Sequence, residues 1–217
     1  FPVAKLALNN SVPPILMASL RMGLVFLILI PFLKLQMPSK KFFKPLVFFS
    51  FSMGVMVYVF MNLSLYYSSI ISPIILGSQL AIPFGILASA FILKENISKN
   101  KWILIFTSFI GITIIFFDPK LSENFYGLFF ASLMALFFGL AQVYSRQLNI
   151  LPISLINAST GIVGFLVLFV ISIFFEGNPF LNIKQINIES WILISYQAII
   201  VSLCAHLLMF YLYKYYT

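Results

Sequence analysis

Residues 66–117 read YYSSIISPIILGSQLAIPFGILASAFILKENISKNKWILIFTSFIGITIIFF, and this stretch decides the fold. Within it, residues 71–93 form a run of 23 residues without a charged side chain. At about 1.5 Å per residue, a helix of that length spans a hydrocarbon core of about 30 Å. A Lys-Glu pair at residues 94–95 ends the run, and a second apolar run begins at Trp102. The stretch therefore predicts two transmembrane helices joined by a short polar turn.

The first of these helices carries small residues on one face and a proline in its middle. Gly77, Ala81 and Gly85 recur at every fourth position, a pattern that lets two membrane helices approach closely. Pro83 has no N–H group, so the carbonyl of Gln79 loses its usual helical partner. In lipid, that carbonyl needs a partner from the protein or from water in a cavity. Two interpretations stay open: a kinked helix that serves packing, or a kink that lines a substrate cavity.

The composition is typical of a polytopic membrane protein. Hydrophobic residues make up 62% of the chain and charged residues 8%, and the mean hydropathy is +1.08. The net charge is +8, but the bases fall in short breaks between apolar runs. We therefore expect the lipid bilayer as a partner and no nucleic acid. Cys204 stands alone and the chain has a single histidine, so we expect no disulfide framework, no metal and no cofactor.

Apolar runs separated by polar turns predict the tail of a first helix and seven complete spans. The tail covers residues 1–8, and the spans cover residues 12–33, 45–66, 71–93, 102–117, 126–144, 152–175 and 191–211. A polar loop is expected over residues 176–190.

Alternate loops differ in charge. Loops 34–44, 94–101 and 145–151, together with the end of the chain, hold nine bases against one acid, Glu95. The positive-inside rule predicts that these three loops are cytoplasmic.

The two halves of the chain resemble each other weakly. Residues 3–23 align with residues 140–161, and LYYS at residues 65–68 matches KYYT at residues 214–217. A repeat of five helices is an odd number, so the second copy would enter the membrane from the opposite side. We therefore predict inverted repeats over residues 1–118 and 125–217. Because the first copy continues for two helices beyond its LYYS, we expect a fragment of a ten-helix protein.

Several motifs together resemble the EamA branch of the drug/metabolite transporter superfamily. They are Pro14 and Arg21 in the second helix, LYYSS, SPIILGSQLAIPFGILASAFILKENIS, and GITIIFFD. The resemblance implies an all-α carrier in the bacterial inner membrane, with inverted five-helix repeats around a central cavity. Such carriers move small metabolites, often amino acids or their derivatives, and commonly outward.

Two bases lie inside apolar spans, where charges usually face a cavity or a partner. Lys5 is close enough to its helix end to snorkel to the interface instead. Arg21 lies deeper, and either contacts substrate or bonds to a neighbouring helix; its planar fork suits a carboxylate or phosphate. In the second repeat, Gln142 and Ser159 lie near the positions that Lys5 and Arg21 hold in the first. A cavity that is positive on one half favours amino acids or organic acids as substrates.

Other polar residues within spans complete the predicted lining, although each is also able to bond across helices. The candidate substrate-binding set is Arg21, Lys5, Asn62, Gln79, Gln142, Asn157, Ser159 and His206. His206 is the in-membrane group that titrates near neutral pH, but a lone histidine is more often a packing residue. None of the five acids falls inside a predicted span, which disfavours efflux of cationic drugs through a buried carboxylate.

Three functions remain open from the sequence. The first is a carrier of anionic or zwitterionic metabolites, such as amino acids, that works by alternating access and exports its substrate. The second is a membrane-embedded enzyme, which the single histidine, single cysteine and lack of an intramembrane acid disfavour. The third is a structural or assembly protein. Convergence of Arg21, Gln79 and Asn157 on one cavity would favour transport over a scaffold.

Overall fold

The computed structural model describes residues 1–33, 38–117, 124–205 and 208, and all regular structure in that part of the chain is helical. The α-helices are α1 Pro2–Asn9, α2 Pro14–Leu29, α3 Lys40–Phe51, α4 Val57–Tyr66, α5 Ser72–Ser78, α6 Ala81–Ile92, α7 Lys99–Phe116, α8 Phe125–Gln147, α9 Ile153–Phe175, α10 Pro179–Gln185 and α11 Ile188–Tyr196. A 3-10 turn, η1 Ile30–Phe32, extends α2, and two π-helical segments are η2 Ser52–Met56 and η4 Gln197–Cys204.

Six spans in the described residues are long and apolar enough to cross a membrane. A seventh joins them if α10 and the helix that follows it, which meet at a bend of 106°, are counted together. The prediction of an all-α polytopic membrane protein is confirmed.

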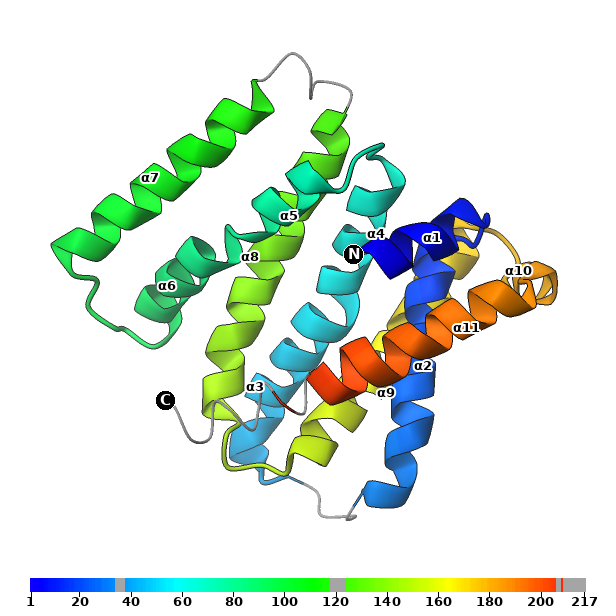
Figure 1. Ribbon diagram of the computed structural model, residues 1–217. Helices are drawn as coiled ribbons and strands as arrows, with labels where there is room; N and C mark the ends of the chain where they lie inside the picture. The colour runs from blue at the N-terminus through cyan, green and yellow to red at the C-terminus, as the bar shows by residue number, and fades with distance from the viewer. Residues whose placement is uncertain (34–37, 118–123, 206–207, 209–217) are drawn as a thin grey trace.

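The long helices form a bundle in which α2, α4, α8 and α9 pack together (Figure 1). The α5–α6 pair lies against α8, and α7 lies beside that pair at the edge of the bundle. On the other side, α11 crosses α1 and α2. The turns that join α1 to α2, α4 to α5 and α9 to α10 all lie at one end of the bundle. We call it the opposite end, because the basic loops lie at the other.

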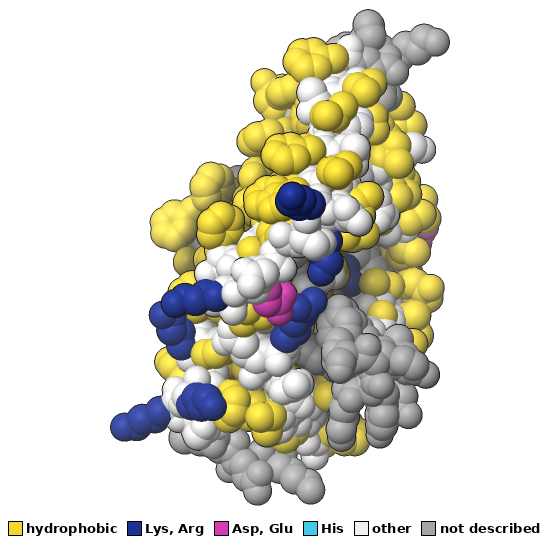
Figure 2. Space-filling model, turned by 90° about the vertical axis from the view of Figure 1, so that its left-hand side faces the viewer, with side chains coloured by type: hydrophobic (Ala, Val, Ile, Leu, Met, Phe, Trp, Pro, Cys, Tyr) yellow, Lys and Arg dark blue, Asp and Glu magenta, His cyan; other side chains and the backbone are white. Residues whose placement is uncertain are grey.

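The basic loops lie together at the other end of the bundle, which we call the basic end. Phe48 on α3 stacks on Tyr144 near the end of α8, with ring centroids 5.3 Å apart. Arg146 pairs with Glu95 across 3.4 Å, which joins the end of α8 to the α6–α7 turn. Figure 2 shows lysine and arginine side chains gathered on one part of a surface that is otherwise largely apolar. The structure thus brings the predicted cytoplasmic loops to one end.

The helix predicted over residues 71–93 is in fact two helices, α5 and α6, with a break at Gln79 and Leu80. Pro83 lies in the first turn of α6, where its missing N–H costs little. The freed carbonyl of Gln79 accepts a hydrogen bond from the N–H of Ile82 at 3.1 Å. A local 3-10 bond therefore satisfies this carbonyl, and no cavity water is needed there.

The small-residue face of this broken helix packs on α8. A Cβ atom added to Gly77 would lie 2.8 Å from a side-chain carbon of Leu128. A Cβ added to Gly139 on α8 would lie 2.7 Å from the backbone N of Gly85 and 3.0 Å from the carbonyl oxygen of Ala81. Contacts this short leave room only for hydrogen, so the two backbones touch. The packing interpretation of Gly77, Ala81 and Gly85 accounts for this face.

The loop predicted over residues 176–190 is wrong, because most of it is helical. Asn178 caps α10 by accepting a hydrogen bond from the N–H of Phe180 at 3.0 Å. Asn187 caps α11 by accepting from the N–H of Ser190 at 2.8 Å. Asparagine side chains in a polar stretch satisfy the open N–H groups of a helix start, and two helices begin where the composition indicated a loop.

We predict that Gly139→Ala lowers the free energy of unfolding by about 1–3 kcal/mol, because the new methyl group overlaps the backbone of α6. The matched control is Gly111→Ala on α7, where no atom lies within 4 Å of the added Cβ. That substitution is expected to be neutral or to stabilise its helix by up to about 1 kcal/mol. The measurement is the unfolding midpoint of each variant in one detergent. Equal midpoints for the two variants would show that the α6–α8 contact is not tight.

Candidate functional site

Arg21 lies inside the bundle, with 4% of its surface exposed. Its Nε donates a hydrogen bond to Ser202 Oγ at 2.7 Å, and its Nη1 donates to Gln197 Oε1 at 3.1 Å. Its guanidinium carbon lies 4.5 Å from the ring centroid of Tyr58, a cation–π contact. The hydroxyl of Tyr58 is also 3.3 Å from Ser202 Oγ. The four side chains form one cluster, which we call the Arg21 cluster.

The Arg21 cluster has no carboxylate among the described residues. The ion pair in the described part of the chain joins Arg146 to Glu95, and both side chains are exposed at the basic end, away from Arg21. Arg21 Nη2 makes no hydrogen bond to the described residues, and the amide nitrogen of Gln197, Nε2, is buried and unpaired there. A buried cation next to unpaired N–H donors is costly in a low-dielectric interior. An anionic group with two oxygen atoms would satisfy both donors.

The π-helical geometry of η4 assembles this cluster. Gln197 and Ser202 are five residues apart, and an α-helix would place them about 140° apart around its axis. A π-helix bonds residues i and i+5, so both side chains reach the same guanidinium. The other π-helical segment, η2, ends two residues before Tyr58. The candidate set from the sequence contains neither Gln197 nor Ser202, because a spacing of five residues gives no helical signal.

Lys5 caps a helix and is not part of the Arg21 cluster. Its Nζ donates to the carbonyl oxygen atoms of Leu65 at 2.6 Å and Ser68 at 2.7 Å. These carbonyls lie at the C-terminal end of α4, where helical partners are missing and a cation is favoured. The contacts of Lys5 support a structural role.

The remaining predicted residues do not gather around Arg21. Asn62 is buried, and its Nδ2 donates to the carbonyl oxygen of Pro14 at 2.7 Å. Gln142 faces Gly85, at a cavity of about 250 Å³ that Arg146 and Glu95 also line. The residues that lie elsewhere are Gln79, whose side chain is exposed, Ser159, which is half-buried, and Asn157, which is buried with an unpaired amide nitrogen in the described chain. His206 lies outside the described residues.

Arg21, Gln79 and Asn157 do not converge on one cavity in the structure, so the criterion that would have favoured transport over a scaffold is not met. The α5–α6 pair that carries Gln79 packs on α8, and its break turns that side chain outward. Arg21 instead takes its partners from η4 and from the residues after η2.

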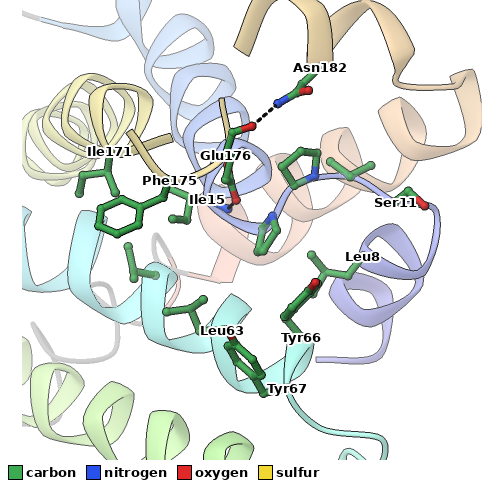
Figure 3. A pocket seen from close by; sticks show the side chains of 14 residues that line it. Leu8, Ser11, Ile15, Leu63, Tyr66, Tyr67, Ile171, Phe175, Glu176 and Asn182 are labelled. Carbon is green, nitrogen blue, oxygen red and sulfur yellow. Dashed lines mark hydrogen bonds between the residues drawn. The ribbon is translucent and has the colours of Figure 1, made fainter. Parts of the chain in front are cut away.

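A cavity of about 700 Å³ opens at the opposite end of the bundle (Figure 3). Its walls come from the α1–α2 turn, the last turns of α4 and α9, and α10. The polar side chains that line it are those of Ser11, Tyr66, Tyr67, Glu176 and Asn182.

Glu176 caps the start of α2 from the end of α9. One carboxylate oxygen, Oε1, accepts from the N–H of Ile15 at 2.6 Å. The other, Oε2, accepts from the N–H of Leu16 at 2.7 Å and from Ser172 Oγ at 2.8 Å. The residues before Ile15 are Pro13 and Pro14, which offer neither an N–H group nor a capping side chain. The carboxylate therefore supplies an N-cap that the local sequence lacks, where the helix dipole favours an anion.

Burial raises the pKa of the Glu176 carboxyl above its ordinary value, and the hydrogen bonds from Ile15, Ser172 and Leu16 offset only part of that shift. The sequence analysis counted Glu176 as a loop acid and missed it. The available signal was the double proline, since a helix that begins this way needs an acceptor from elsewhere.

We predict that Glu176→Ala lowers the free energy of unfolding by about 1–2 kcal/mol, because the N–H groups of Ile15 and Leu16 lose their acceptor. The control is Glu189→Ala, which removes an exposed carboxylate at the start of α11 and is expected to change stability less. Denaturant unfolding in one detergent compares the two. A larger loss for Glu189→Ala would rule out a capping role for Glu176.

Comparison with known proteins supplies the family. A family model described as the EamA-like transporter family matches residues 1–117, which is more than half of the chain. A search of curated proteins finds no match. Residues 125–217 lie outside the matched range, so the second repeat stays a prediction. The chain belongs to the EamA-like transporter family of the drug/metabolite transporter superfamily, whose members are membrane transporters of small molecules.

Proposed function

We propose that this protein exports a small metabolite with an anionic group, an amino acid or a related anionic or zwitterionic compound, by alternating access across the bacterial inner membrane. The observation that carries the proposal is the buried guanidinium of Arg21, which has no carboxylate partner among the described residues. Its neighbour Gln197 also keeps an unpaired amide there.

The chemistry of the Arg21 cluster suits a carboxylate. In this arrangement the neutral oxygen atoms of Gln197 and Ser202 fill part of the coordination of the cation. A substrate carboxylate supplies a full negative charge and two oxygen atoms in the geometry of the guanidinium fork. A hydrogen bond to a charged group contributes about 1.5–3 kcal/mol, so the substrate competes well against neutral side chains.

Access to Arg21 requires movement of η4, because its residues Gln197 and Ser202 cover the guanidinium. A π-helical segment is a point at which a helix readily changes its bonding pattern. Movement of η4 is the step by which the cluster exchanges its internal partners for substrate. The proposal therefore assigns the conformational change of alternating access to η4.

The proposed outward direction is the one that the family resemblance implies. With the basic end in the cytoplasm by the positive-inside rule, the cavity of about 700 Å³ faces outward. In an exporter, substrate released from Arg21 toward the opposite end would leave through this cavity.

We predict that Arg21→Gln lowers counterflow of a labelled amino acid or organic acid at least about tenfold, because a charge-assisted bond is lost. The assay uses full-length protein in proteoliposomes that are preloaded with a pool of amino acids and organic acids. Removal of a buried, uncompensated charge relieves its desolvation cost, so the variant is expected to fold. The matched control is Arg146→Gln, which removes an exposed arginine at the basic end.

Uptake that Arg21→Gln leaves intact would make Arg21 structural and overturn its place in the site. Absence of exchange for every member of the pool would overturn the substrate class. That second result would favour an enzyme or an assembly protein over a carrier of these compounds.

A further inference from the structure

We propose that Glu176 forms a second, outer site that binds the cationic ammonium group of the substrate. The proposal rests on the proposed function, and it narrows the substrate from anions in general to zwitterions. Glu176 and the cavity that it lines at the opposite end of the bundle have no part in the Arg21 cluster.

The carboxylate of Glu176 lacks a cationic partner in the described chain. Its three hydrogen bonds come from two backbone N–H groups and the hydroxyl of Ser172, all of them neutral donors. An ionised carboxylate has about four acceptor positions, so at least one stays open. Since Oε1 accepts only the bond from Ile15, the open position is on that oxygen atom. An ammonium group would supply both the missing bond and the missing charge.

The cavity next to this carboxylate suits the rest of such a molecule. Its volume of about 700 Å³ lies within the range of small-molecule sites. Val59, Leu63 and Ile171 give it apolar walls, and Figure 3 shows Tyr66 and Tyr67 on the α4 side of the space. Aromatic rings tolerate both an apolar body and a cation. The site thus combines an anion, aromatic rings and apolar walls.

The carboxylate of Glu176 and the guanidinium of Arg21 lie at different levels along α2. Glu176 binds the N–H groups of Ile15 and Leu16, and Arg21 follows five and six residues later on α2. At about 1.5 Å per residue, these levels are separated by about 8–9 Å along the helix axis. In an α-amino acid a single carbon atom separates ammonium from carboxylate, so one molecule does not span both levels. The substrate therefore meets the charges in succession, its carboxylate at Arg21 and then its ammonium at Glu176.

A purely structural role for Glu176, as the cap of α2, is the competing explanation. Glu176→Gln removes the negative charge, and its one amide oxygen keeps one of the two hydrogen bonds from the N–H groups of α2. The amino acid is therefore compared with its deaminated analogue, because a weakened cap affects both compounds alike. Burial raises the pKa of the Glu176 carboxyl, so a neutral group is accommodated there and this variant is expected to fold. If Glu176 only capped α2, it would give the protein no preference for an amino acid over the same compound without its amino group.

The experiment compares amino acids with the same compounds lacking the amino group, for example leucine with 4-methylpentanoate. Full-length protein in proteoliposomes exchanges a labelled amino acid, and each compound is tested as a competitor. We expect the wild type to prefer the amino acid, and Glu176→Gln to lower that preference about tenfold, the value of one charge-assisted bond. Binding of the deaminated acid is expected to change little.

Ser172→Ala is the matched control, because it removes one hydrogen bond from the carboxylate and keeps the charge. We expect its preference for the amino acid to equal that of the wild type. If Glu176→Gln weakens both compounds equally, or neither, the outer ammonium site is overturned while the carrier function stands. If the wild type exchanges neither compound, the proposed function itself fails for this class.

Acidification gives an independent readout of the same charge. The titratable or charged side chains on the elements around Glu176 are Lys5 on α1, Arg21 on α2, Tyr58 and Tyr66 on α4, Tyr67 directly after α4, and Lys184 on α10. Because the Glu176 pKa is raised, this carboxyl is protonated as the pH falls, before an ordinary carboxyl is. The preference for the amino acid should then fall in the wild type and stay constant in Glu176→Gln. A parallel fall in both proteins would assign the pH effect to another group and overturn this role of Glu176.

Discussion

The absence of water from the hydrocarbon core is the constraint on which the rest of this structure depends. Each polar group inside the bundle needs a partner from the chain or remains costly. The carbonyl of Gln79 finds a local N–H, the end of α4 uses Lys5, and the start of α2 uses Glu176. Arg21 differs in that it is a buried cation whose hydrogen-bond partners in the described residues are neutral. We therefore take this buried cation as the strongest candidate for function.

Helix α2 organises both candidate sites. Its Pro-Pro start creates the need for an external cap, and its interior carries the buried cation. Because the helix is rigid, Glu176 and Arg21 stay at separate levels and do not neutralise each other. In our proposal, the guanidinium of Arg21 and the carboxylate that caps the start of α2 together form an electrostatic path for a dipolar substrate, which neither charge would form alone.

Local sequence patterns predicted the spans well and their details less well. Charge-free runs predicted the helices, and the described parts of the three basic loops do lie at one end of the bundle. Pro83 indicated a distortion but not that α5 and α6 are separate helices. The loop predicted over residues 176–190 was wrong because two asparagine caps override a polar composition. These errors concern single hydrogen bonds, which average hydropathy does not register.

The sequence by itself determined the membrane-spanning class, the sidedness of the charges and the burial of Arg21 within a span, because these depend on residues close together in the chain. Tertiary structure alone decided which groups meet. Arg21 bonds to Ser202 across 181 residues, and Glu176 caps α2 across about 160 residues. It also separated Gln79 and Gln142 from the cluster that they were expected to join. The physical reason is that partners distant in sequence are chosen by helix packing and by the π-helical turn of η4, which leave no periodic signal in the residues themselves.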